Sequence, residues 1–275
     1  MIEGDVMIEN WKASWGKRIR DSLYPISAGL AILILWQWAT VFFSIRDTLL
    51  PSPLVVFREF FNLRSLLYTH ALVTIYETFF GLILAIFISI IISIIMVWSV
   101  GAEKAILPWI VFFESTPKIA IGPLLIIWFG FGYAPKVIVS FWLAYFPITI
   151  ATMTGLKAIP PEMVELTKSM SATTLQTFIK VRIPNALPYF FSGLKLGGVV
   201  SMLGAVLGEY IGSDAGLGYL IVMANHNANV KLLFPVVITM VILGKTMYSL
   251  VVWVEKYAIS WHVAVRSKEE KFFTA

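Results

Sequence analysis

The sequence has 275 residues, of which 59% are hydrophobic, 15% aromatic and only 13% charged, with a formal net charge of +5. Soluble domains carry about 25% charged residues, and a chain of this length cannot bury so much apolar surface in a water-soluble core. These values exclude a soluble enzyme, a disordered chain and a disulfide-stapled secreted domain, and the lack of cysteine also excludes thiolate metal sites. The sequence therefore predicts an all-α polytopic membrane protein.

The first segment, residues 1–23, is amphipathic. Ile8, Trp11, Trp15 and Ile19 recur at helical spacing with basic residues between them. This pattern favours a helix lying on the inner leaflet of the membrane, and a frayed tail is the alternative.

Six apolar stretches follow, each close to the length of about 20 residues that crosses a bilayer. The first is too long for a secretory signal and no cleavage site follows it, so we expect an uncleaved helix. The third contains Pro117, which is expected to break the helix. The six predicted spans form a transmembrane domain over residues 24–258, followed by a tail at 259–275; they lie at about 24–45, 74–100, 105–131, 137–156, 186–207 and 232–257.

The basic residues of the loops predict the orientation, because cytoplasmic loops carry the excess of Lys and Arg. With the N-terminus inside, thirteen of them lie on the cytoplasmic side, three lie within spans and five lie opposite, namely Arg46, Arg58, Arg64, Lys136 and Lys231. Both termini are therefore expected in the cytoplasm. The basic surplus follows the membrane topology, and no basic patch with stacking aromatics indicates nucleic-acid binding.

One loop is too long to be a simple connector. It covers about residues 157–185, between the fourth and fifth spans. Pro161 and Glu162 suit the first turn of a helix, helix-compatible sequence runs through residues 163–170, and a second basic stretch covers 175–182. This layout predicts a short helix outside the bilayer.

The same loop resembles the signature of permease subunits of ATP-binding-cassette (ABC) importers. That signature is Glu-Ala-Ala, three residues, Gly, nine residues and Ile-x-Leu-Pro. Here the equivalent positions begin at Glu165, Ser171 and Val181; the spacing is kept, whereas the alanines and the glycine are replaced. Residues 117–132, Tyr145-Phe-Pro147 and Gly216-Leu-Gly218 are also similar to the nitrate, sulfonate, taurine and pyrimidine-precursor importers, and the likeness covers about residues 50–262.

The resemblance implies a permease subunit of a type I ABC importer, a multi-pass protein of a prokaryotic plasma membrane. The loop helix would be a coupling helix seated in a separate ATPase subunit; a solvated amphipathic loop helix is the alternative. The implied contact residues are Glu162, Glu165, Ser169, Met170, Ser171 and Ala172. Further implied partners are a second permease copy, most simply in a homodimer, and an extracytoplasmic solute-binding protein.

The sequence has no Gly-x-x-x-x-Gly-Lys-Ser/Thr phosphate loop. We therefore expect no cofactor on this chain, with ATP and Mg²⁺ used by the partner ATPase subunits. The chain is not expected to be an enzyme, since motifs such as His-Glu-x-x-His are also absent. An ion-coupled secondary transporter or a channel is the alternative function, and a docking helix would be superfluous in either.

Charged residues within the spans, where they are costly, are candidates for contacts with the solute or with one another. They are Glu77, Glu114, Lys118, Glu209 and Lys245. The predicted translocation-path residues are Glu114, Lys118, Trp142, Tyr145, Glu209 and Tyr210. Each has an alternative: Glu114 and Lys118 are spaced to form a structural ion pair, the aromatics suit packing, and Glu209 could hold the Gly-Leu-Gly loop through backbone amides. The sequence leaves the solute open among oxyanions, sulfonates, aromatic acids and vitamin precursors.

Overall fold

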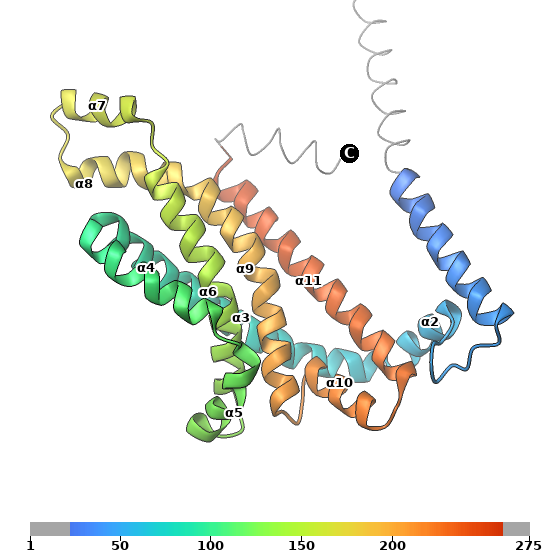
Figure 1. Cartoon of the computed structure of the whole chain (residues 1–275). Helices are drawn as coiled ribbons and strands as arrows, with labels where there is room; N and C mark the ends of the chain where they lie inside the picture. Colours follow the sequence, from blue (N-terminus) through green and yellow to red (C-terminus); the bar gives the residue numbers. More distant parts are fainter. Residues whose placement is uncertain (1–22, 261–275) are drawn as a thin grey trace, which may run out of the picture. The chain divides into compact units, whose positions relative to one another are not determined.

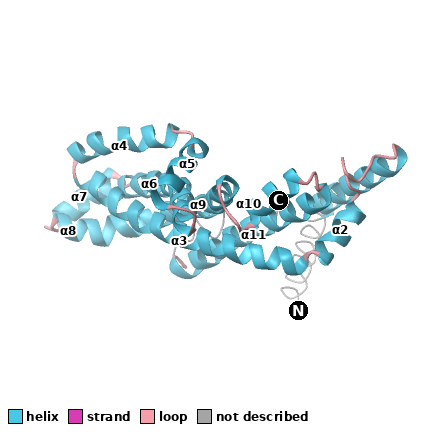
Figure 2. Ribbon diagram, turned by 90° about the horizontal axis from the view of Figure 1, so that it is seen from below, coloured by secondary structure: helices cyan, strands magenta, loops and turns pink. Residues whose placement is uncertain are grey.

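The computed structural model describes residues 23–260, and within that range every regular element is a helix (Figure 2). The predicted amphipathic N-terminal segment and nearly all of the C-terminal tail lie outside the described residues. The chain divides into two compact units, one formed by residues 1–58 with 260–275 and the other by residues 59–259. Each unit is described separately.

The described part of the first unit contains the apolar helix Leu23–Phe42. This helix is connected by turns to α2 (Pro53–Asn62), which begins in the first unit and ends in the second. The Gln37 side-chain oxygen accepts a hydrogen bond from the Leu54 backbone N–H at 3.3 Å, so the helix and the start of α2 are held together.

The second unit contains the remaining helices (Figure 1). In chain order these are α3 (Arg64–Trp98), α4 (Val100–Ser115), α5 (Lys118–Phe129), α6 (Tyr133–Lys157), α7 (Pro161–Ser169), α8 (Thr174–Thr177), the π-helical turn η1 (Phe178–Arg182), α9 (Ile183–Ile211), α10 (Leu217–His226) and α11 (Val230–Ala258).

Five helical stretches of the described chain are long and apolar enough to cross a membrane, and α4 with α5 makes a sixth when the two are counted as one. Five of the six predicted spans are thus single helices, although α3 begins ten residues earlier than predicted because it continues beyond its apolar section. The predicted third span is different. Its two halves are bent by 95° at Thr116 and Pro117, where the ring and missing N–H of proline interrupt the helix. The expected break at Pro117 is therefore present.

The most extensive helix pairing in the second unit is between α6 and α9. A Cβ atom on Gly204 of α9 would lie 2.7 Å from Ser140 Cα and 2.8 Å from Val139 O of α6. Only a residue without a side chain fits there, so the two backbones touch, as is common between membrane helices. In this part of α9 the small residues therefore serve close helix packing.

Buried hydroxyl groups connect the central helices. Thr149 Oγ1 donates to Ser89 Oγ at 2.9 Å, and Ser89 Oγ donates to the Tyr145 carbonyl at 3.0 Å, which links α6 to α3. Ser140 and Ser201 share a hydrogen bond of 2.8 Å between α6 and α9. Because each hydroxyl has a partner inside the bundle, these polar groups can be buried without a large desolvation cost.

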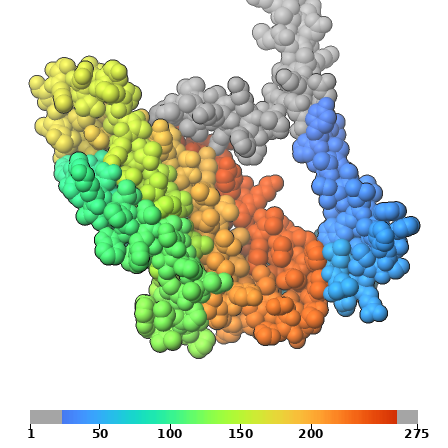
Figure 3. Space-filling model, in the orientation of Figure 1, coloured from blue at the N-terminus to red at the C-terminus, as the bar shows by residue number. Residues whose placement is uncertain are grey.

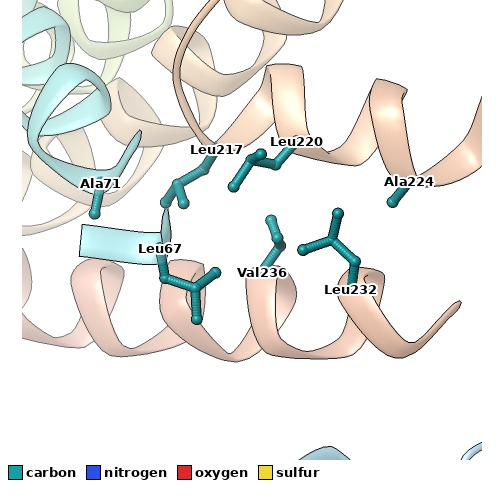
Figure 4. Close-up of a cluster of buried hydrophobic side chains, with 7 residues drawn as sticks. All are labelled: Leu67, Ala71, Leu217, Leu220, Ala224, Leu232 and Val236. Atoms are coloured by element: carbon teal, nitrogen blue, oxygen red, sulfur yellow. The ribbon is translucent and has the colours of Figure 1, made fainter. Parts of the chain in front are cut away.

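Apolar packing also joins α3, α10 and α11. The side chains in this cluster point toward one another from the three helices (Figure 4); they are Leu67, Ala71, Leu217, Leu220, Ala224, Leu232 and Val236. The cluster fixes the short helix α10 against the end of the second unit. That end lies opposite the projecting α7 and α8, which are yellow in Figure 1.

Candidate functional site

The loop between α6 and α9 projects from the second unit as a separate lobe (Figure 3). Helix α7 lies where the sequence predicts a loop helix, with Pro161 in its first turn and Glu162 at its positive end. None of its residues is buried. Met163, Leu166 and Met170 are 44%, 53% and 73% exposed, so an apolar surface is presented away from the chain.

Most of the predicted coupling residues share this exposed position. Glu162, Glu165, Ser169, Met170 and Ser171 are exposed, and Ala172 is half-buried. The Ser169 hydroxyl donates to the Glu165 carbonyl at 2.9 Å. Ser171 has a φ of 53°, in the left-handed region. Glycine adopts that conformation without the steric cost that a side chain brings, which explains why the resembled signature has glycine at this position.

Side chains at the base of the loop attach it to both neighbouring spans. Asn185 Nδ2 of α9 donates to the Gly155 and Ala158 carbonyls at 3.1 and 3.0 Å, and Arg182 Nη1 donates to the Leu156 carbonyl at 3.2 Å. These carbonyls lie at the C-terminal end of α6, where backbone carbonyls have no N–H partner within the helix.

Apolar and ionic contacts complete the base of the loop. Phe178 of η1 is 6% exposed and packs with Leu156 and Ala186, and its ring lies edge-on to Trp98 with centroids 5.4 Å apart. Lys157 pairs with Glu103 of α4. The loop is therefore anchored to α3, α4, α6 and α9.

The opposite end of the second unit contains a buried polar cluster centred on Glu209. Three consecutive backbone N–H groups at the start of α10 each donate to a side chain. Gly218 donates to Glu209 Oε2 at 2.6 Å, Leu217 to Thr74 Oγ1 at 3.0 Å and Gly216 to His70 Nδ1 at 3.0 Å. Thr74 Oγ1 in turn donates to Glu209 Oε1 at 2.6 Å. Glu209 thus holds the Gly-Leu-Gly loop through a backbone amide, and its carboxylate lies at the positive end of a helix.

A buried ion pair lies on the same helices. Lys136 Nζ of α6 is 3.3 Å from Glu77 Oε1 of α3, with side chains 5% and 0% exposed. Lys136, which the sequence places in a loop, therefore belongs to the core. Lys136 also lines a pocket of about 550 Å³ between residues 131–133 and the loop of residues 212–215.

The other predicted path residues lie apart from this cluster. Glu114 and Lys118 form the ion pair that their spacing allows, at 3.0 Å across the bend between α4 and α5. Trp142 is half-buried with its ring 6.0 Å from that of Phe113, and Tyr145 is buried with its ring 5.6 Å from that of Phe141. Tyr210 is 43% exposed. The structure brings Glu209 together with Thr74, His70 and the start of α10. Glu77, another of the predicted charges within the spans, lies beside Glu209, whereas the other predicted path residues do not join this group.

Sequence reasoning assigned no role to His70, Thr74 or Asn185. Thr74 and Glu209 are 135 residues apart in the chain, and Gly216 and His70 are 146 apart. No local spacing relates them. The available signal was the Gly216-Leu-Gly218 sequence, which follows the span that ends near Glu209.

The long apolar helices, the broken span and the anchored projecting loop are the architecture of a multi-pass membrane protein. Residues 81–258 match the family described as binding-protein-dependent transport system inner membrane component. The chain belongs to this family.

Individual relatives agree with this assignment. The chain is 35% identical over 231 residues to a probable ABC transporter permease protein of Haemophilus influenzae, a match that covers 84% of this chain and 94% of the relative. It is 35% identical over 204 residues to the formylaminopyrimidine transport permease protein ThiX of Halalkalibacterium halodurans, covering 74% and 81%. A chain of a solved amino acid ABC transporter shares the fold with a TM-score of 0.61 at 15% identity, covering 71% of this chain and 95% of that one.

These findings favour a permease subunit of an ABC importer over an ion-coupled transporter or a channel. The chain is a transport subunit and a multi-pass membrane protein.

Proposed function

We propose that the projecting loop is the coupling element through which a separate ATPase subunit drives this permease. The single observation that carries the proposal is the exposed apolar surface of α7, with Leu166 53% and Met170 73% exposed on a loop whose base is anchored to four helices. An exposed apolar surface on an ordered element is typical of a protein interface. Leu166 and the predicted coupling residues form the proposed contact; the latter are Glu162, Glu165, Ser169, Met170, Ser171 and Ala172.

The proposal extends to the partners, the cofactors and the membrane in which the subunit works. ATP and Mg²⁺ bind to the ATPase subunits, and this chain binds no cofactor. Two permease copies, most simply a homodimer, form the path in a prokaryotic plasma membrane with the loop and both termini on the cytoplasmic side. A solute-binding protein delivers the solute from the other side. The formylaminopyrimidine named for one relative makes a small polar organic solute the first to test.

Two matched substitutions in the loop test the contact. Leu166→Asp places a charge in the proposed interface, where its desolvation is costly, and we expect it to abolish co-purification with the ATPase subunit. Leu175→Asp is the control, because Leu175 of α8 is also an exposed leucine, at 56%, and lies outside the proposed contact. Glu165→Lys should weaken the same association by reversing a charge. Unchanged ATPase binding and unchanged transport in Leu166→Asp and Glu165→Lys would refute the proposal.

A further inference from the structure

A lysine lies near the middle of a membrane-spanning helix and points out of the unit. Lys245 is close to the centre of α11, which has 29 residues from Val230 to Ala258. At 1.5 Å per residue, about 20 Å of helix extends on each side of it. The lysine side chain cannot reach a headgroup region over that distance, so snorkelling does not account for it.

The surroundings of Lys245 are polar. Lys245, Thr246 and Ser249 are all exposed and line a shallow depression of about 330 Å³ together with Ile242 and Leu250. The Thr246 hydroxyl donates to the Ile242 carbonyl at 2.7 Å. The Lys245 ammonium and the Ser249 hydroxyl are therefore the hydrogen-bond donors that this surface offers to a ligand.

Among the described residues of the second unit, Lys245 has no carboxylate at ion-pair distance, and the carboxylates of the membrane helices are engaged elsewhere. Glu209 is held by Thr74 and Gly218. The others are paired with lysines: Glu77 with Lys136, Glu103 with Lys157, Glu114 with Lys118 and Glu255 with Lys195. A second copy of these residues would accordingly bring no spare carboxylate to Lys245.

We propose that Lys245, Thr246 and Ser249 face the aqueous translocation path, and that Lys245 and Ser249 bind the anionic group of a solute in transit. A cation at this depth is stable where it faces water or an opposite charge rather than lipid chains. The ligand is a carboxylate, sulfonate or phosphate group, which accepts charge-assisted hydrogen bonds from the ammonium. This inference rests on the proposed function, because it requires that a solute pass through this subunit.

Because the chain has no cysteine, single cysteines report the environment of chosen positions in the assembled transporter. Ser249→Cys places a thiol one helical turn from Lys245. Membranes are treated with either of two water-soluble methanethiosulfonates, the sulfonatoethyl reagent, which is anionic, or the trimethylammonioethyl reagent, which is cationic. Rates are divided by those for a free thiol in solution, which removes the intrinsic difference between the reagents.

We expect the thiol of Ser249→Cys to react, and the anionic reagent to be preferred at least about tenfold, because a local positive potential concentrates anions. The preference should disappear in the double variant with Lys245→Gln. Ile91→Cys is the control, since Ile91 is 57% exposed and its exposed neighbours one helical turn away, Phe87 and Ile95, are apolar, so that its thiol should react with neither reagent.

Three results would overturn the inference: no reaction of the thiol in Ser249→Cys, equal rates with the two reagents, or a preference that persists without Lys245. None of these measurements involves the loop. A failed coupling proposal would appear as unchanged ATPase binding in Leu166→Asp, whereas a failed anion site would appear in the labelling rates alone.

Discussion

Glu209 shows how a buried charge can serve structure at the level of a single residue. Its side chain is 1% exposed, and its two oxygens accept from Gly218 N–H and Thr74 Oγ1, both at 2.6 Å. Three helices supply these groups, since Thr74 belongs to α3, Glu209 to α9 and Gly218 to α10. The carboxylate therefore connects α3, α9 and α10 at one point.

Glu209→Gln tests this role. An amide retains one acceptor oxygen and presents an NH₂ group to a former donor, which leaves a buried group unsatisfied at a cost of about 1–3 kcal/mol. We expect faster hydrogen exchange at the Leu217 and Gly218 amides, measured by mass spectrometry on the purified transporter. Asp214→Asn is the control, because Asp214 is exposed in the neighbouring loop and its exchange pattern should match that of the wild type. Equal protection in Glu209→Gln would contradict the assigned role.

At the level of the helices, the structure separates what local sequence predicts from what it does not. Apolar length predicts the spans, and Pro160-Pro161-Glu162 predicts the start of α7, because these signals act within one helix. Pro117 is a local cause of the break between α4 and α5. The bend angle of 95° depends on how the two helices pack and is not predicted by the local sequence. The partners of Glu209 and Asn185 come from other helices, so their identity depends on tertiary arrangement.

The contact of α6 with α9 gives a prediction about two glycines of the same helix. Gly204→Ala would place a Cβ 2.7 Å from Ser140 Cα, and because that atom is backbone, the helices must separate. Overpacking of this kind costs typically about 1–3 kcal/mol. Gly198→Ala is the control, since a Cβ there would have its nearest neighbour at 3.6 Å. We expect a lower Tm in detergent for Gly204→Ala only; equal Tm values would show that the backbones are not in contact.

For the whole molecule, the proposed coupling predicts that the contacts between the loop and the spans control how much of the ATP hydrolysis is used for transport. Asn185 donates two hydrogen bonds to α6 carbonyls. Asn185→Asp keeps the shape of the side chain but replaces the donating NH₂ group by a carboxylate oxygen, which repels the two carbonyl oxygens. We expect ATPase binding to persist while the solute transported per ATP hydrolysed falls several-fold.

Asn229→Asp is the matched control for this prediction. Asn229 caps α11 by accepting from the Leu232 N–H at 3.2 Å, and aspartate accepts equally well at a helix N-cap. Transport and ATP hydrolysis are measured together in proteoliposomes with the complete transporter. A transport-to-hydrolysis ratio in Asn185→Asp equal to that of Asn229→Asp would show that the donors at the loop base do not couple the two processes.

The backbone contact between α6 and α9 also has a mechanical consequence. Helices that touch along their length and share buried hydroxyl bonds bend little, and α9 alone is about 44 Å long at 1.5 Å per residue. If this pair tilts as a lever about its loop end by about 5°, its far end is displaced by roughly 4 Å. That displacement exceeds the 2.6 Å hydrogen bond from Gly218 to Glu209. If α3 and α10 stayed in place, a small rotation at the loop end would therefore be sufficient to separate the polar groups around Glu209 at the other end.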